Sequence, residues 1–188
     1  MNSIKIILAS QSPRRKQLLQ QIGVTPVCCP VDIDESIYEK EAAKDYCNRL
    51  AMEKAQAAWD NSDKSLAVIG SDTIVVLNGK TLGKPKDEED AFNMLMMLSG
   101  QTHHVITAVA IINAQKQKVV DVISIVEFGL LNTNEITDYI ASKEPMDKAG
   151  SYAIQGQAAK WIKNISGSYS GIMGLPLYET AKLLQEFT

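Results

Sequence analysis

Two long runs of apolar and β-branched residues, HHVITAVAIIN at 103–113 and KVVDVISIVEF at 118–128, limit most what this chain can fold into. Valine and isoleucine favour extended structure, and only a short polar segment separates the two runs. We therefore expect two long strands that pair as antiparallel neighbours. Their apolar faces need further elements to cover them, which indicates an elongated, curved central sheet.

The rest of the chain alternates helical with extended patterns. The expected helices cover residues 13–22, 41–59, 87–98, 134–142 and a final segment from Pro176, and the other expected strands cover 4–9, 66–77 and 160–165. Asn78-Gly79 predicts a hairpin turn directly after the strand expected at 66–77. The order predicts a mixed α/β fold in which helices flank the curved sheet and two lobes surround a cleft.

Composition narrows the class of protein. The chain has 188 residues, 45% of them hydrophobic, with no repeats or linker, and we expect a single domain over residues 1–188. A net charge of −3 argues against a nucleic-acid surface. No run approaches the roughly 18 apolar residues of a membrane span, and Met1–Ala9 is too short for a signal peptide, so a cytoplasmic location is expected. The three cysteines form neither a disulfide framework nor a zinc motif.

The segment LASQSPRR at residues 8–15 places two cations where a helix begins. Ser12 is the expected N-cap and Pro13 the first helical residue, so Arg14 and Arg15 lie in the first turn. A helix N-terminus repels cations. The arrangement becomes favourable if a phosphate binds to the free N–H groups, the arginines and the hydroxyls of Ser10 and Ser12. A solvated basic turn is the alternative.

Asp72 interrupts an apolar strand in the segment LAVIGSDTIVVLNG. A carboxylate buried there needs a partner or a cation, which suits a general base or a metal ligand. The alternative is an aspartate at a bulge beside Gly70, hydrogen-bonded to backbone.

Three further charged residues have both a functional and an ordinary interpretation. Lys84 in GKP is presented by a proline-fixed turn, Lys54 lies on a small-residue helix face, and Glu35 belongs to the acidic segment VDIDES, whose oxygens suit a hard divalent cation. Solvated or packed side chains are the alternatives for all three.

Taken together, the motifs resemble those of the Maf family of nucleoside triphosphate pyrophosphatases. The resemblance spans the chain through LASQSPRR, RLAMEKA at 49–55, IGSDTIVVLNGKTLGKP at 69–85, LSGQTHHVITAVAI, DKAGSYAIQG and GLPLYET at 174–180. It implies a fold shared with inosine triphosphate pyrophosphatases and a homodimer. It also implies hydrolysis of a nucleoside triphosphate to the monophosphate and pyrophosphate.

The resemblance also implies residue roles. Phosphate contacts fall to Ser10, Arg14, Arg15, Lys54 and Lys84, with Asp72 as proton acceptor, Glu35 beside Asp72 at a divalent metal such as Mg²⁺ or Mn²⁺, and substrate specificity assigned to Arg14, Thr73 and Gln155. SDT at 71–73 with IQG at 154–156 is similar to the dTTP/UTP branch, with modified pyrimidine nucleotides as further substrates. The alternatives are a 7-methyl-GTP or other modified-nucleotide pyrophosphatase and a nucleotide-sensing regulator of septum formation.

Overall fold

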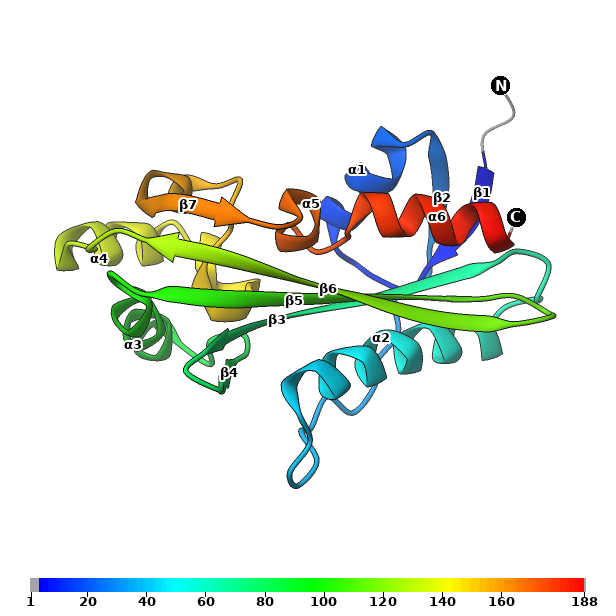
Figure 1. Ribbon diagram of the computed structural model, residues 1–188, viewed down its shortest axis with the longest axis horizontal. Coiled ribbons are helices and arrows are strands. Elements are labelled where there is room, and N and C mark those ends of the chain that lie inside the picture. The colour runs from blue at the N-terminus through cyan, green and yellow to red at the C-terminus, as the bar shows by residue number, and fades with distance from the viewer. Residues whose placement is uncertain (1–3, 188) are drawn as a thin grey trace. The chain divides into compact units, whose positions relative to one another are not determined.

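The structure, a computed structural model, describes residues 4–187. Its elements (Figure 1) run in the order β1 (Ile4–Leu8), α1 (Pro13–Gln21), β2 (Val24–Cys28), α2 (Ala43–Asp60), β3 (Val68–Leu77), β4 (Lys80–Leu82), α3 (Glu88–Leu98), β5 (Thr102–Ile112), β6 (Gln117–Phe128), α4 (Thr133–Ala141), the 3₁₀ turns η1 (Glu144–Asp147), η2 (Ala149–Ser151) and η3 (Gln157–Trp161), β7 (Ile162–Ser166), α5 (Tyr169–Ile172) and α6 (Leu177–Phe187).

Within residues 4–187 the strands form a seven-stranded sheet in the order β2-β1-β3-β5-β6-β7, with β4 paired to β3 off this path. β1 runs parallel to β2 and to β3, whereas β4 and β7 are antiparallel to their partners. β5 and β6 are joined by a short turn in which the Asn113 N–H donates to Lys116 O at 3.0 Å, so they run in opposite directions (Figure 1). The predicted mixed α/β class and the antiparallel pair are confirmed.

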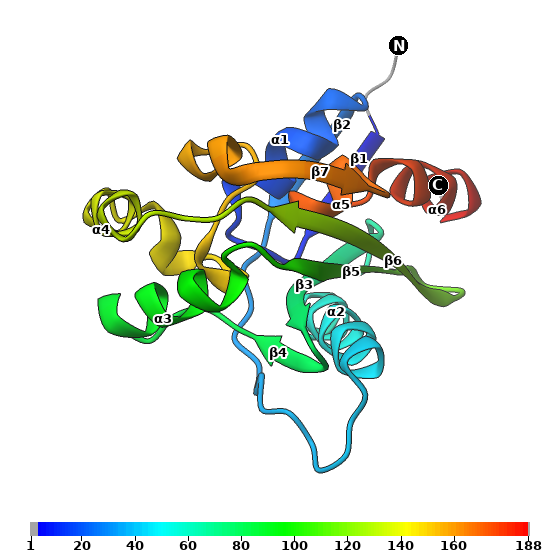
Figure 2. The same cartoon turned by 60° about the vertical axis from the view of Figure 1, so that its left-hand side comes forward.

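The described residues group into two compact units. Unit 1 contains residues 4–72, 107–122 and 174–187, and unit 2 contains residues 73–106 and 123–173. In unit 1, β1 and α2 bury Ile6, Leu8 and Leu50. In unit 2, α3 and α4 lie next to each other (Figure 2), and Leu95 and Tyr139 from these helices belong to its hydrophobic core.

Local sequence signals account for most of the element boundaries. The observed helices begin and end within two residues of the expected ones wherever both ends were predicted. Asn78 and Gly79 have φ values of 49° and 78°, the left-handed geometry that an Asn-Gly hairpin turn requires. Among the helices of the described part of the chain, none is long and apolar enough to cross a bilayer.

The sequence prediction was wrong about some short elements. It missed β2, a parallel strand at the end of the sheet order, because Pro26 lowers the strand tendency of VTPVC and is tolerated there. It treated EPMDKAGSYAIQG as a plain loop, whereas η1 and η2 lie in this segment. It also missed α5, and η3 takes the first two residues of the strand expected at 160–165.

Candidate active site

The basic turn at the start of α1 is built by two serines and a half-buried arginine. Ser12 Oγ accepts a hydrogen bond from the Arg15 N–H at 3.4 Å, which confirms the predicted N-cap. Ser10 Oγ accepts from Ser12 N–H at 3.1 Å and from the Arg15 guanidinium at 3.2 Å. Burial lowers the pKa of Arg15 and the negative charge of Asp72 opposes that shift, so both groups act within one electrostatic environment. Arg14 lies in the same first turn.

A backbone carbonyl that the sequence did not single out fixes this turn in unit 1. Gly174 O accepts from Arg15 Nε at 2.8 Å and lies 3.0 Å from the hydroxyl of Ser71. Ser71 is fully buried, and its hydroxyl also lies 2.8 Å from Ala108 O. The residue before Asp72 in β3 is thereby connected to the guanidinium in α1. GLPLYET, which begins at Gly174, is the sequence signal that could have pointed here.

Three charged side chains converge beside this turn. Lys54 Nζ lies 2.6 Å from Asp72 Oδ1 and 2.6 Å from Glu35 Oε1. Asp72 is only 7% exposed, and β3 continues through it to Leu77, so its carboxylate faces Lys54 from the interior of a strand. Of the two interpretations of Asp72, the structure favours a charged group with a charged partner over a strand-end cap.

The close approach of α2 to β3 depends on Gly70. A Cβ at Gly70 would lie 2.3 Å from Ala51 O and 2.5 Å from Ala55 N. The absence of a side chain lets the helix backbone lie directly against the strand. Lys54 lies between Ala51 and Ala55 in α2, and it therefore reaches Asp72, which follows Gly70 by two residues in β3.

The same helix holds the acidic loop that carries Glu35. Tyr46 Oη donates to the backbone O of Glu35 at 2.8 Å, and Arg49 Nη2 donates to Ser36 O at 2.9 Å. Arg49 is itself held by Glu41, with Nε 2.6 Å from the carboxylate. Burial raises the pKa of Tyr46 to about 12, so its phenol remains a donor at neutral pH. Sequence reasoning missed Tyr46 and Arg49, although Arg49 begins the RLAMEKA motif.

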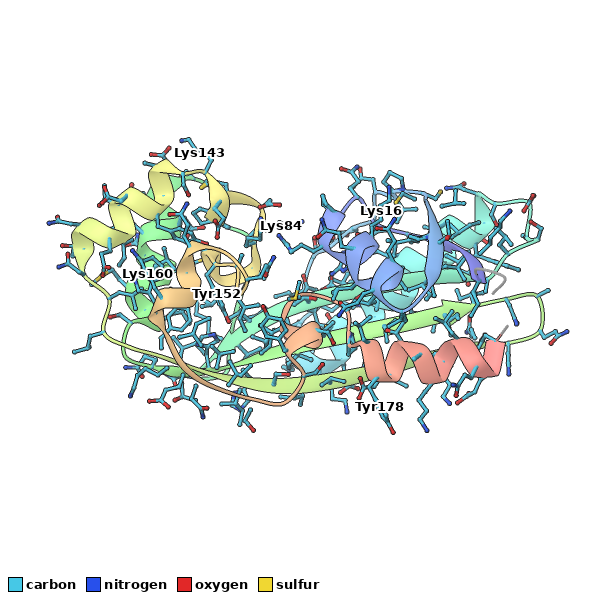
Figure 3. The ribbon with its side chains drawn as sticks, turned by 90° about the horizontal axis from the view of Figure 1, so that it is seen from above. Lys16, Lys84, Lys143, Tyr152, Lys160 and Tyr178 are labelled. Atoms are coloured by element: carbon cyan, nitrogen blue, oxygen red, sulfur yellow. The ribbon has the colours of Figure 1, made fainter. Side chains whose placement is uncertain are left out.

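Three predicted site residues belong to unit 2. Thr73 is half-buried in β3, and Gln155 is exposed in the segment between η2 and η3. Lys84 is exposed, and Figure 3 shows its side chain extending outward from unit 2. Gly83 O accepts from Gly150 N–H at 3.0 Å, so the segments that carry Lys84 and Gln155 are joined through their backbones.

The predicted residues therefore divide between the units. The structure places in unit 1 Ser10, Ser12, Arg14, Arg15, Glu35, Lys54 and Asp72, and in unit 2 Thr73, Lys84 and Gln155.

Comparison with known proteins places the chain in a family. The model of the family described as Maf-like protein matches residues 5–187. The chain belongs to the Maf family. It is 48% identical over 184 residues to the dTTP/UTP pyrophosphatase of Escherichia coli strain K12, covering 97% of this chain and 92% of that protein. It is also 48% identical to the dTTP/UTP pyrophosphatase of Vibrio vulnificus strain YJ016, covering 97% and 98% of the two chains. The family resemblance predicted from the motifs is confirmed.

A solved structure is also similar to the Maf chain. The Staphylococcus aureus Ham1 protein aligns over 97% of both chains with a TM-score of 0.45 and 14% sequence identity.

Glu35 and Asp72 are the residues that could hold a divalent cation in this Maf chain. Their carboxylate oxygens converge on one positive group, the Lys54 ammonium, and such hard oxygen donors suit Mg²⁺ or Mn²⁺. Among residues 4–187 no cluster of three or more His, Cys, Asp or Glu side chains forms a metal site. Two carboxylates fit a cation whose other ligands come from phosphate and water.

The buried cysteine next to Asp72 is not a nucleophile of this site. Within the described residues, Cys28, Cys29 and Cys47 are not joined in disulfides. Burial, reinforced by the charge of Asp72, raises the pKa of Cys47 to about 12, so this thiol stays protonated at neutral pH and is no nucleophile.

Proposed function

We propose that this Maf chain hydrolyses dTTP, UTP and modified pyrimidine nucleoside triphosphates to the monophosphate and pyrophosphate. The observation that carries the proposal is the Lys54 ammonium held between Asp72 and Glu35 in the unit that also carries the basic turn. A protein that only bound phosphate would gain nothing from a buried carboxylate, which repels it. The names of the relatives in Escherichia coli and Vibrio vulnificus support the choice of substrate.

In this mechanism Asp72 is the general base. Its carboxylate orients a water molecule and takes its proton as the oxygen attacks the α-phosphorus. A divalent cation bound by Glu35 and Asp72 would polarise the phosphate and lower the pKa of the attacking water. Lys54 and Arg15 are positioned before substrate arrives, so they stabilise the charge that develops on the phosphates without reorganisation.

The remaining predicted residues complete the substrate site. Arg14 and Lys84 add cations for the departing pyrophosphate, and the hydroxyls of Ser10 and Ser12 lie at the same turn. Gln155, with Thr73 and Arg14, determines base preference. Its amide offers the donor and the acceptor that the O4 and N3–H edge of uracil or thymine requires.

The test is a panel of UTP, dTTP, CTP, GTP and 7-methyl-GTP with Mg²⁺ or Mn²⁺, in which pyrophosphate and orthophosphate are measured separately. We expect monophosphate and pyrophosphate as first products, with UTP and dTTP preferred. Initial release of a nucleoside diphosphate would contradict the proposed bond cleavage. A preference for 7-methyl-GTP would show that this nucleotide, rather than a pyrimidine nucleotide, is the substrate. The absence of turnover with every nucleotide would favour the alternative of a nucleotide-sensing regulator of septum formation.

Asp72→Asn tests the catalytic role in the same assay. The amide keeps the shape of the carboxyl group but loses its basicity, so turnover should fall by at least about 100-fold. Nucleotide binding, measured by calorimetry, should persist. A variant within a few-fold of the wild type would show that another group is the base.

The proposal includes a homodimeric enzyme, as the family resemblance implies, and a cytoplasmic location, as expected from the sequence. Light scattering of the purified protein and cell fractionation test these two statements.

A further inference from the structure

The segment that carries Gln155 is fixed by contacts that the proposed chemistry does not use. Gln155 is exposed, whereas the three residues before it, Tyr152, Ala153 and Ile154, are buried. The segment between η2 and η3 has no helix or strand of its own. The direction of the Gln155 amide therefore depends on how the backbone on each side of it is held.

Two linked side chains hold that backbone. On one side of Gln155, the Ala153 N–H donates to Tyr139 Oη at 3.2 Å. On the other, the Gln157 N–H donates to Glu144 Oε1 at 3.1 Å and lies 3.4 Å from Oε2. Tyr139 Oη donates in turn to Glu144 Oε1 at 3.0 Å. The backbone groups that flank Gln155 are thus joined through two side chains, which we call the loop brace, Tyr139 and Glu144.

Both residues of the brace contact other parts of unit 2. Tyr139 in α4 is 2% exposed and packs edge-to-face against Trp161, with ring centroids 5.1 Å apart. Glu144 lies directly against the backbone of Gly156, where a Cβ would be only 1.8 Å from Oε1. The carboxylate therefore occupies the space that a side chain at position 156 would take, against the backbone immediately after Gln155.

From this geometry we propose that Tyr139 and Glu144 are positioning residues that set base selectivity by fixing the orientation of Gln155. The inference rests on the proposed role of Gln155 in base recognition. A hydrogen-bonding site discriminates between bases only while its donor and acceptor are held in place. The phosphate-binding groups are other residues, so a loosened segment affects selectivity and spares cleavage.

The experiment compares Tyr139→Phe and Glu144→Ala with the wild type and with Gln155→Ala. For each protein, kcat/KM is measured for UTP, dTTP and CTP by pyrophosphate release. Phe keeps the ring that packs on Trp161 and loses only the hydroxyl. Each variant removes the hydrogen bond to one of the two N–H groups that flank Gln155. The ratio of kcat/KM for UTP to kcat/KM for CTP should therefore fall by about five-fold, the effect of one good hydrogen bond. The value for CTP should stay within about two-fold of the wild type, since the phosphate contacts remain.

Two matched variants separate positioning from general destabilisation. Glu144→Gln keeps an oxygen that accepts both hydrogen bonds, and its ratio should stay within about two-fold of the wild type. Tyr152→Phe removes another buried hydroxyl in the same segment, one that lies 2.8 Å from His103 Nε2 and contacts neither flanking N–H. Its ratio should likewise stay within about two-fold, because the brace is untouched.

Several outcomes would overturn the inference. The brace is refuted if Tyr139→Phe and Glu144→Ala keep the wild-type ratio while Gln155→Ala loses it, or if they slow all three nucleotides equally. It is also refuted if Glu144→Gln matches Glu144→Ala or if Tyr152→Phe matches Tyr139→Phe. If the wild type shows no base preference, or Gln155→Ala retains it, the proposed base recognition fails first and the brace fails with it.

Discussion

Gly70→Ala tests whether the close approach of α2 to β3 builds the site. The added Cβ would lie 2.3 Å from Ala51 O, about 1.1 Å short of an ordinary van der Waals contact, and 2.5 Å from Ala55 N. Both atoms belong to the backbone of α2, so no side chain can rotate away. The helix itself has to move by roughly 1 Å. Lys54, which lies between these alanines, would move with it.

The structure gives two magnitudes for this substitution. Overpacking against backbone costs about 3 kcal/mol of the free energy of unfolding, at the upper end of what added core methyl groups cost. For a chain of this length that corresponds to a Tm lower by about 6 to 12 °C. A displacement of about 1 Å at Lys54 should also reduce kcat/KM for UTP by about 100-fold in the folded protein.

Urea unfolding and pyrophosphate release measure the two effects, and Gly83→Ala is the matched control. A Cβ at Gly83 meets nothing within 4 Å and its φ is not in the left-handed region, so its stability should change by less than about 1 kcal/mol. If Gly70→Ala costs no more than this control, or keeps wild-type activity, then close packing of α2 on β3 does not position Lys54.

Two further substitutions test the charged groups. Lys54→Met leaves the Asp72 carboxylate buried without its ammonium partner and should lower the free energy of unfolding, measured with urea, by about 2–4 kcal/mol. The double variant Lys54→Met/Asp72→Asn should lose less, because the buried charge is also removed. A double variant that is no more stable than Lys54→Met would contradict this. Burial, with the nearby charge of His104, lowers the pKa of His103 to about 4 from its ordinary 6.5, so the unfolded chain binds a proton that the folded chain excludes between these values. Stability should therefore fall by about 3 kcal/mol as pH drops from about 6.5 to 4, and His103→Gln should lose that part of the slope; an unchanged slope would refute it.

The outline of the fold could be predicted from the sequence, because helix caps, turns and strand runs are encoded by neighbouring residues. Ser12 and Pro13 define the start of α1, Asn78-Gly79 the hairpin, and valine-rich runs the long strands. β2 was not readable, because the pairing of VTPVC with β1 is decided by a parallel register between separate segments rather than by its own composition.

The site was only partly readable from the sequence. Each of Glu35, Lys54 and Asp72 could be singled out, but nothing local says that one ammonium lies 2.6 Å from both carboxylates. Gly70 carried a signal that was available, since a glycine inside a buried strand often marks close backbone approach. The brace could not have been found, because Glu144 reads as a solvated acid until the fold brings it against Gly156.

The charges of unit 1 explain how a chain that is acidic as a whole can attract a triphosphate. Arg14, Arg15 and Lys54 against Glu35 and Asp72 leave one excess positive charge in this group, on a chain whose net charge is −3. The excess is unevenly distributed. The arginines lie at a helix N-terminus, which adds its own partial positive charge, whereas the two carboxylates share one ammonium. On the proposed function, the turn suits phosphate and the carboxylate pair suits a divalent cation, so a triphosphate that arrived with such an ion would match both groups, and Lys54 would then neutralise phosphate.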